Sequence, residues 1–488
     1  MGSGPAGMAA SVEASAAGLD VMVFEKVSRT GGAREGGIGP MAVGSYLQEQ
    51  DNVDFTVDEG FEFMMTHGRW RTNAMLVSAY LNQTADTIEW LEDMGIKFTG
   101  TGAYYKGAAR VLHNFDFMRG MNITTALRRR GDAQNVRYMC NCPVKSVLME
   151  NGRVSGVTGI GADGEAFTAK AKAVIVCTGG FAGDPELVHA QGFTKDVDLF
   201  YTFEMPELAG DGLRMIWEAG GARGGMMMDT YLGLVKGYGG PMGTAPRLAN
   251  LRQYSNIFVN QKGHRFMRED LLRNPAYAGN AVHAQYKGCA VSILDQGLYE
   301  YYQAEEEKNA KRMPPMPEPD PDAPPREPQP FERFTGTMSE IMEEAIAQGV
   351  TDFFIADSLE EFAEKAEIPY DELKETMDEY NAACIAGEDK MLHKNRAYLR
   401  PITGPRYYGA RFYCDTYGGL GGVVIDHKAR VLNDEQDPVP GLYAAGNDAN
   451  TIFGDTYPFY MAGNTSSFAL NTGRLAAKDA VKYVGRLK

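Results

Sequence analysis

The chain has 488 residues, 44% hydrophobic and 23% charged, an ordinary globular composition with length for about two to four domains. Its 48 basic and 64 acidic residues give a net charge of -16, which argues against nucleic acid or an anionic membrane surface as a partner. Six cysteines without a Cys-x-x-Cys pair argue against a disulfide scaffold and common zinc or haem motifs, and we predict no metal site. No apolar run reaches the ~20 residues of a spanning helix, and no signal-peptide pattern is seen. We therefore expect a cytoplasmic protein without membrane insertion.

The chain begins with a glycine-rich turn over residues 2–7, followed by helix-forming residues up to Gly18. A short apolar run over residues 21–24 then ends at Glu25. This order of turn, helix, strand and acid is typical of a dinucleotide-binding unit, where the turn binds pyrophosphate and the acid binds ribose hydroxyls. Only Met1 precedes the turn, so the first strand of such a unit has no residues to form it. Either the native chain starts further upstream, or the sheet lacks this strand.

Residues 136–180 carry the pattern of short strands. We expect strands at 136–140, 144–148 and 154–157, with Asn151-Gly152 as a hairpin turn, and a buried parallel strand at 173–177. Near the C-terminus, residues 438–447 indicate a turn, a buried strand and a second glycine turn. Gly463 precedes a helix that we predict to run to Ala480, and the N-terminus of that helix would favour negative charge.

The composition changes at residues 304–334, where nine prolines lie among many acidic residues. Proline disrupts helices and inner strands, so we expect an exposed, polyproline-like loop over this range. It is either a solvated loop or a docking segment for a partner. Residues 336–385 have the pattern of amphipathic helices and are predicted to be helical.

These segments together resemble the FAD-binding flavoproteins of the fumarate reductase, succinate dehydrogenase and 3-ketosteroid dehydrogenase group. The resemblance covers nearly the whole chain, including the opening turn with Glu25-Lys26, residues 177–181, Gly210-Asp211-Gly212 and residues 441–446. It implies an α/β fold, with a discontinuous Rossmann-like FAD-binding domain at residues 1–230 and 405–488. A cap (substrate) domain of α+β type would be inserted at residues 231–404, with the substrate between the cap and the flavin.

The resemblance also implies that FAD is bound without a covalent link, because the glycine stretch at residues 31–37 has no histidine and the first histidine is His67. The residues that it assigns to FAD are Gly2, Gly4, Pro5, Ala6, Gly7, Glu25, Lys26, Gly31, Gly32, Gly37, Val144, Thr178, Gly179, Gly180, Asp211, Gly446, Asn447, Asn464 and Ser466.

Residues 256–269 resemble the strand, turn and Arg-Phe-x-x-Glu signature of this group. Arg273, eight residues after Arg265, matches the arginine that serves as proton donor in fumarate reductases. An arginine can donate a proton repeatedly only if a relay restores it, because its free pKa is above ~12. Glu269 and Asp270 are the candidate relay partners, and the alternative is that Arg273 is a surface or salt-bridge residue.

Residues 454–458 resemble the ketosteroid dehydrogenase motif whose tyrosine polarises a ketone, so Tyr457 is the candidate hydrogen-bond donor to the substrate, with Tyr277 in reserve. A packed turn tyrosine is the alternative for Tyr457. Tyr460 stands where fumarate reductases have a carboxylate-binding arginine, and we include it among the candidate catalytic residues. The loss of that arginine argues against fumarate as the substrate.

We therefore predict an FAD-dependent reductase that transfers hydride from reduced flavin to an activated C=C bond of an apolar cyclic substrate. A ketosteroid-type enone or an isoflavonoid derivative would fit, and tetrahydrodaidzein reductase is one enzyme of this kind. The alternatives are a desaturase of the 3-ketosteroid dehydrogenase type and the flavin subunit of a larger electron-transfer assembly. No second dinucleotide fingerprint, haem motif or iron–sulfur motif is seen. Electrons would therefore come from an external donor: a reduced nicotinamide, a flavin or a redox protein.

Overall fold

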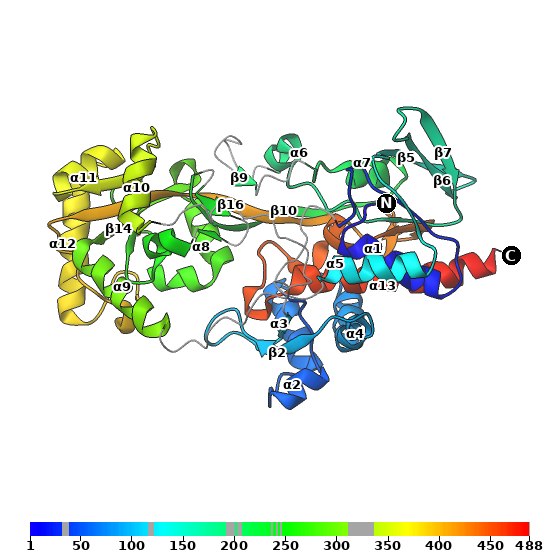
Figure 1. The fold of residues 1–488 in the computed structure, drawn as a ribbon, viewed down its shortest axis with the longest axis horizontal. Helices are drawn as coiled ribbons and strands as arrows, with labels where there is room; N and C mark the ends of the chain where they lie inside the picture. Colours follow the sequence, from blue (N-terminus) through cyan, green and yellow to red (C-terminus); the bar gives the residue numbers. More distant parts are fainter. Residues whose placement is uncertain are drawn as a thin grey trace. The chain divides into compact units, whose positions relative to one another are not determined.

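The structure, a computed structural model, describes residues 1–31, 39–115, 122–191, 201–202, 207–235, 238–240, 243–244, 246–310 and 336–487 (Figure 1). The chain divides into two compact units. Unit 1 comprises Met1–Phe193, Glu204–Asp229 and Gly418–Lys488, and unit 2 comprises Thr194–Phe203 and Thr230–Tyr417. Helices and strands alternate along both, which confirms the predicted α/β class. The assignment of cofactor and substrate to separate domains stays a prediction.

Unit 1 contains parallel strand pairs next to the opening turn. Helix α1 (Pro5–Ala16) leads to β1 (Met22–Phe24), which pairs in parallel with β4 (Arg137–Met139). Strand β8 (Val174–Val176) pairs in parallel with β18 (Pro438–Ala444), and β18 pairs with the antiparallel β17 (Arg430–Leu432).

The first two residues lie between these strand pairs. Gly2 N donates to Phe24 O at 2.8 Å, and Cys177 N donates to Met1 O at 2.8 Å. Met1 N donates to Ile175 O, also at 2.8 Å. Met1 and Gly2 thus occupy the position of the first strand that is expected in a dinucleotide-binding unit.

The core of unit 1 forms where α1 crosses the long helix α13 (Asn464–Arg486). Met8, Val12 and Leu470 are buried there together with residues of α4 (Ala74–Glu92) and α5 (Ile123–Ala133). The crossing is close, because a Cβ added at Gly473 would lie 2.3 Å from Ala6 O. Small residues at this crossing therefore bring the N-terminal turn next to the C-terminal helix.

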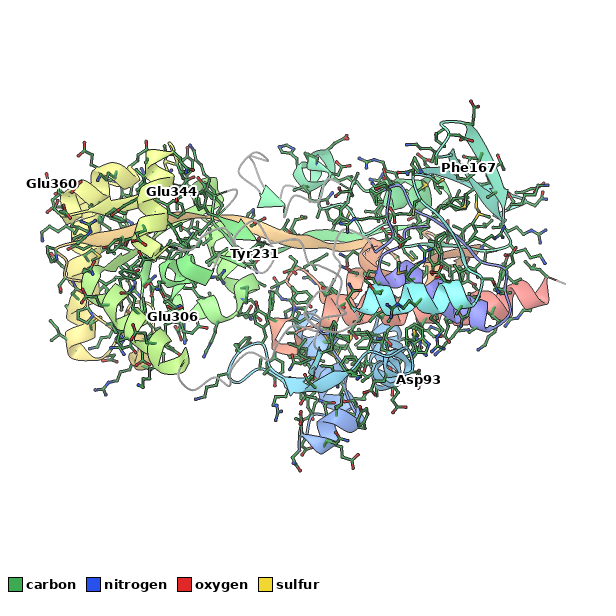
Figure 2. The ribbon with its side chains drawn as sticks, in the orientation of Figure 1. Asp93, Phe167, Tyr231, Glu306, Glu344 and Glu360 are labelled. Carbon is green, nitrogen blue, oxygen red and sulfur yellow. The ribbon has the colours of Figure 1, made fainter. Side chains whose placement is uncertain are left out.

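Strands β5 (Val144–Glu150), β6 (Arg153–Ile160) and β7 (Ala166–Lys170) form an antiparallel sheet in unit 1. Asn151 and Gly152 both have positive φ, 51° and 73°, as a type I′ turn requires, so the predicted hairpin is confirmed. Phe167 of β7 stacks on Phe24 of β1 at 4.8 Å (Figure 2).

The remaining elements of unit 1 surround this framework. They are α2 (Tyr46–Gln50), α3 (Val57–His67), β2 (Phe98–Gly102), β3 (Leu112–Phe115), α6 (Pro185–Ala190), α7 (Asp211–Glu218) and β19 (Ala449–Asn450). Helices α2 and α3 each begin with a capping box, at Ser45 and Thr56.

Unit 2 is built on an antiparallel sheet. Its long strand β16 (Tyr407–Val423), which continues into unit 1, pairs with β14 (Cys289–Asp295) and β15 (Phe353–Ala356), and β14 pairs with β13 (Ile257–Val259). Strand β10 (Arg223–Gly233) lies beside β16, and its Tyr231 donates to Asp415 at 2.6 Å (Figure 2). The short β9 (Tyr201–Thr202), β11 (Gly239–Gly240) and β12 (Gly243–Thr244) complete the strands described in this unit.

Helices cover this sheet: α8 (Pro275–His283), α9 (Gln296–Ala310), α10 (Met338–Ala347), α11 (Leu359–Ala366) and α12 (Tyr370–Ala386). Two predictions made for this region are wrong in part. Residues 304–310 are not loop but the end of α9, because the first proline comes only at Pro314 and helix formers precede it. Phe353–Ala356 is a strand within the range predicted as helical, because pairing with β16 buries its apolar run. Residues 311–334 of the proline-rich range lie outside the described residues.

None of the described helices combines the length and hydropathy that crossing a bilayer would take. Likewise, no cluster of three or more His, Cys, Asp or Glu side chains within the described ranges is arranged to hold a metal ion.

A buried histidine joins β3 to the start of α2. His113 Nδ1 donates to Val111 O at 2.9 Å, and His113 Nε2 accepts from Ser45 Oγ at 2.6 Å. Burial lowers the pKa of His113 to about 4 from an ordinary value of 6.5. The imidazole is therefore neutral in the folded protein at neutral pH, and one tautomer satisfies both contacts.

This depressed pKa predicts acid sensitivity of unit 1. As the pH falls from 6.5 toward 4, the imidazole of the unfolded chain takes up a proton before the folded one does, so the folded state loses stability. The full shift corresponds to about 3 kcal/mol. We expect chemical unfolding between pH 7 and pH 4.5 to show a steeper loss of stability in the native protein than in His113→Gln, which has no imidazole to titrate. Equal slopes for the two proteins would contradict this expectation.

Candidate active site

The opening turn is built for close approach of backbones. Gly2 has a φ of +84°, and a Cβ there would lie 2.0 Å from Cys177 O. A Cβ at Gly7 would lie 2.0 Å from Gly2 O. Helix α1 starts with Pro5 after Gly4, and no side chain caps its first N–H groups. These groups and the positive end of the helix dipole form the kind of cradle that binds a pyrophosphate.

We expect Gly7→Ala to abolish most FAD binding. The added methyl group overlaps backbone rather than a flexible side chain, and overpacking of this kind costs about 1–3 kcal/mol, or roughly tenfold or more in affinity. The measurement is the flavin-to-protein absorbance ratio of the purified protein. Gly485→Ala in α13 is the matched control, since nothing lies within 4 Å of its added Cβ. A normal flavin content in Gly7→Ala would refute the role of the turn.

Glu25 is buried immediately after β1, and its carboxylate is fixed by the turn itself. Its Oε2 accepts from Ser3 N at 2.9 Å and from Ser3 Oγ at 2.7 Å, and its Oε1 accepts from Val27 N at 3.1 Å. The neighbouring Lys26 pairs with Asp211 at 2.7 Å. Turn, acid and the start of α7 are therefore joined into one arrangement, and Ser3 takes a part that the sequence pattern did not reveal.

The turn after β8 depends on another residue whose role the sequence pattern did not reveal. The buried carboxylate of Asp448 accepts from Gly180 N at 3.0 Å, from Thr178 Oγ1 at 3.0 Å and from Thr178 N. Burial raises the pKa of Asp448 above its ordinary value although these donors act in the opposite direction. Asp448 follows Gly446-Asn447 in what looks like an ordinary glycine turn, so no local pattern distinguishes it.

The start of α13 forms a second place for negative charge. Gly463 precedes it with a φ of +87° and gives no side-chain cap, and a Cβ there would lie 2.6 Å from Gly39 O. The Asn464 side chain is occupied within the protein, because it accepts from Tyr80 Oη at 2.7 Å and donates to Met461 O at 2.6 Å. Ser466 lies in the first turn of α13.

All described residues of the predicted FAD set lie in unit 1. Gly31 N donates to Ser3 O at 3.1 Å, Val144 opens β5, and Gly446 N donates to Thr472 Oγ1 at 3.0 Å. Asn447 Oδ1 accepts from Asn450 Nδ2 at 3.2 Å. Gly32 and Gly37 lie outside the described residues. The glycine cradle, the fixed acid and the start of α1, where no side chain caps the N–H groups, fit a dinucleotide.

Tyr457 is buried in unit 1 with its hydroxyl at the start of α13. Tyr457 Oη accepts from Thr465 N at 3.0 Å, and its ring contacts Phe453 and Phe459. Burial raises the pKa of the Tyr457 phenol well above its ordinary value. The phenol is therefore neutral, and because its oxygen accepts from Thr465, its own proton is available to a further acceptor.

Tyr460 lies in an aromatic group of the same unit. Its ring is 4.6 Å from that of Phe63 and 6.3 Å from that of Phe55. Tyr460 therefore contributes an aromatic ring at the sequence position where fumarate reductases, in the resemblance described above, have an arginine. Tyr277, in α8 of unit 2, is 42% exposed, so the reserve candidate lies on the surface of that unit.

Arg273 ends the short 3-10 helix η3 (Glu269–Arg273) in unit 2 and is partly buried. Within the described residues, no carboxylate lies at ion-pair distance from it. Asp270, which is buried, accepts from Arg268 Nε at 2.9 Å and from Arg268 Nη2 at 2.5 Å. Hydrogen bonds from Arg268 and the charges of Arg268 and Arg273 hold the pKa of Asp270 below its ordinary value, although burial opposes them.

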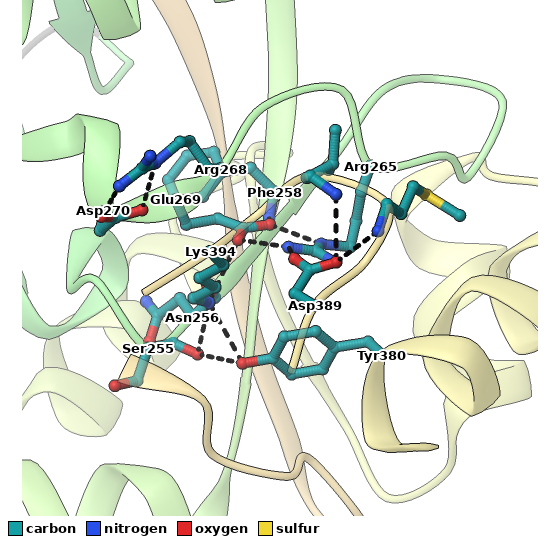
Figure 3. Close-up of polar contacts among 12 residues, drawn as sticks. Ser255, Asn256, Phe258, Arg265, Arg268, Glu269, Asp270, Tyr380, Asp389 and Lys394 are labelled. Carbon is teal, nitrogen blue, oxygen red and sulfur yellow. Dashed lines mark hydrogen bonds and ion pairs between the residues drawn. The ribbon is translucent and has the colours of Figure 1, made fainter. Parts of the chain in front are cut away.

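The other relay candidate, Glu269, belongs to a buried group of four charges (Figure 3). It accepts from Arg265 Nε at 2.8 Å and Arg265 Nη2 at 2.7 Å, and pairs with Lys394 Nζ at 3.1 Å. Arg265 also donates to Asp389 at 2.9 Å, and Lys394 also donates to Tyr380 Oη at 3.1 Å. Glu269 is therefore engaged in fixing the base of η3, which leaves Asp270 as the relay candidate.

Comparisons with known proteins identify the family and the fold of the chain. The sequence profile of a family described as "FAD binding domain" matches residues 1–465. The chain is 28% identical to the vinyl phenol reductase of Lactiplantibacillus plantarum, over 99% of this chain and 96% of that one. It is 27% identical to the fumarate reductase (cytochrome) of Shewanella frigidimarina, over 99% of this chain and 76% of that one.

A solved structure shares the fold. The 3-ketosteroid delta1-dehydrogenase of Sterolibacterium denitrificans, in complex with 1,4-androstadiene-3,17-dione, superposes with a TM-score of 0.77 at 20% identity. The alignment covers 99% of this chain and 98% of that one.

Proposed function

Because the chain belongs to the FAD-binding domain family, we propose that this FAD-dependent oxidoreductase works as a reductase of an activated C=C bond in an apolar cyclic substrate. Action on CH–CH or C=C bonds is common to the reductases and dehydrogenases among its relatives. The bound flavin supplies the hydride. The observation that carries the proposal is the buried Tyr457 phenol, whose oxygen accepts a hydrogen bond from Thr465 N and whose pKa burial raises.

Tyr457 binds and polarises the oxygen that is conjugated with the double bond. Negative charge develops on that oxygen when hydride reaches the far carbon, and a donor already oriented by the protein stabilises it without reorganisation. The Thr465 N–H at the start of α13 strengthens the donor, because a hydroxyl that accepts a hydrogen bond is a better donor itself.

Arg273 supplies the proton that completes the reduction. Asp270 is buried one turn before it, beyond ion-pair distance, so in this proposal a bridging water carries the proton between this carboxylate and the guanidinium. Arg268 is bidentate on Asp270 and its side chain is 41% exposed, so it connects this carboxylate with solvent. The three residues form the proposed relay from solvent to substrate.

The substrate is a neutral ring compound. The tilted pair of Tyr460 and Phe63 offers an aromatic surface, and Tyr460 supplies no cation for a carboxylate. A ketosteroid-type enone, an isoflavonoid derivative and a vinyl phenol, the last favoured by the similarity to a vinyl phenol reductase, each combine a ring with an oxygen conjugated to C=C. The opposite direction, desaturation of a ketosteroid, is the second candidate, favoured by the shared fold with a ketosteroid dehydrogenase.

Electrons come from an external donor, for which a reduced nicotinamide, a flavin and a redox protein are the proposed classes. A cytoplasmic location remains part of the proposal.

The proposed function is tested by anaerobic reoxidation. The flavin of the purified protein is reduced chemically, and 4-androstene-3,17-dione, daidzein, 4-vinylphenol or fumarate is added while flavin absorbance is followed. We expect rapid reoxidation by at least one of the ring compounds and none by fumarate. Reoxidation by fumarate alone would overturn the substrate class, and bleaching of oxidised flavin by a saturated 3-ketosteroid would establish the opposite direction.

A further inference from the structure

The last turn of α3 contacts the segment that carries Tyr457. His67 Nε2 lies 2.5 Å from Thr456 O. Four residues before it, the ring of Phe63 contacts that of Tyr460 in a tilted arrangement, with centroids 4.6 Å apart. Gly68, which ends the helix, lies so close that a Cβ on Gly454 would be 3.2 Å from its Cα. Residues 454–460 therefore rest on the end of one helix.

The contact made by His67 has a defined polarity. A backbone carbonyl only accepts hydrogen bonds, so His67 Nε2 carries the proton and donates it to Thr456 O. Both the neutral imidazole with this tautomer and the imidazolium can donate from Nε2. The ring is also held by Phe63, whose ring centroid is 5.6 Å away at an interplanar angle of 26°. Stacking on Phe63 thus fixes the orientation of the imidazole ring, and the carbonyl acceptor fixes which atom donates.

The carbonyl that His67 holds belongs to the peptide linking Thr456 to Tyr457. The orientation of this peptide determines the direction in which the Tyr457 side chain leaves the backbone. At the far end of that side chain, Thr465 N donates to the hydroxyl. Tyr457 therefore has one anchor on its backbone and one on its hydroxyl. We propose that His67 is a positioning residue for Tyr457: it fixes the Thr456–Tyr457 peptide so that the phenol reaches both Thr465 N and the substrate oxygen. The second half of this statement rests on the proposed function.

Amide exchange tests the positioning without any substrate. Thr465 is the second residue of α13, so its N–H has no partner within the helix and is protected by Tyr457 Oη. We expect His67→Phe, which keeps a ring on Phe63 and removes the donor, to speed hydrogen–deuterium exchange at Thr465 in the FAD-bound protein. Tyr457→Phe is the positive control. Thr66→Ala, an exposed change on the same turn, is the matched control and leaves exchange unchanged. Unchanged exchange in His67→Phe would overturn the positioning role.

Turnover tests the consequence for catalysis. With the fastest acceptor found in the reoxidation assay, we expect His67→Phe to lose about 10²-fold in the rate of flavin reoxidation, the usual effect of a small misplacement. His67→Gln, which retains an N–H donor, should recover most of this loss. The double variant His67→Phe/Tyr457→Phe should be no slower than Tyr457→Phe alone, because His67 acts through Tyr457. A loss in the double variant equal to the product of the single losses would contradict the inference.

The outcomes separate the two proposals. Faster exchange at Thr465 with no effect on any acceptor would uphold the positioning role and refute the proposed use of Tyr457. Normal exchange with a large loss of turnover would refute the positioning role and leave the proposed function standing. If His67→Phe fails to retain FAD, His67→Asn, whose shorter side chain cannot reach Thr456 O, takes its place in both measurements.

Discussion

Arg273→Ala is expected to keep FAD bound and to slow reoxidation of the reduced flavin by its acceptor at least about 10³-fold, which is about 4 kcal/mol of barrier. The reason is that hydride transfer leaves a carbanion or enolate that must take up a proton, and the proposed source of that proton is removed. Arg273 belongs to unit 2, whereas every described residue of the predicted FAD set belongs to unit 1, so flavin content should not change. Single-turnover absorbance at the flavin band measures the rate.

Two further variants sharpen this test. Asp270→Asn should also slow proton delivery, because a buried amide cannot return a proton to Arg273. Arg396→Ala, a change of an exposed arginine in the same unit, is the matched control and should be silent. A loss of less than about tenfold in Arg273→Ala, or equal losses in Arg273→Ala and Arg396→Ala, would remove Arg273 as the proton donor.

Tyr457→Phe is expected to lower the same rate by about 10²–10³-fold, the usual effect of removing one oriented donor from a developing oxyanion. The ring contacts with Phe453 and Phe459 remain, so only the hydroxyl and its bond to Thr465 N are lost. Binding of the acceptor, followed through the spectrum of the oxidised flavin, should weaken less than the rate falls, since charge on the oxygen is largest in the transition state.

Tyr277→Phe discriminates between the two tyrosine candidates. Tyr277 is exposed on α8, so its hydroxyl is expected to contribute little, and Tyr277→Phe should react at the native rate. If Tyr277→Phe shows the large loss and Tyr457→Phe does not, the assignment of the polarising hydroxyl is reversed.

Local sequence patterns predicted the elements whose causes are local. The glycine turn with α1 and β1, the Asn151-Gly152 hairpin and the glycine-led helix α13 follow from backbone freedom and short-range hydrophobic pattern, and the structure confirms them. The strand Phe353–Ala356 was missed because its cause is not local: its apolar run is equally suited to a buried helix until β16 is there to pair with it.

The site shows the same division. Glu25 could be predicted from its distance after the glycine turn, whereas Asp448 acts on Thr178 and Gly180, some 270 residues earlier, and no spacing rule covers that separation. His67 reaches Thr456 across 389 residues. The roles of Asp448 and His67 follow from the groups they contact, and contacts between residues so far apart in sequence are known only from the folded structure.

The buried group of four charges limits which substitutions can accumulate at its positions, Arg265, Glu269, Asp389 and Lys394. Removing one member of a buried ion pair leaves an uncompensated charge and costs about 3–5 kcal/mol, whereas exchanging a whole set for apolar residues is often neutral. Single substitutions in this group are therefore disfavoured, whereas the joint replacement of all four residues by apolar ones is expected to be tolerated. We therefore expect Asp389 and Lys394, in the loop after α12, to change only together with Arg265 and Glu269. Related sequences that carry one of these four residues are expected to carry all of them.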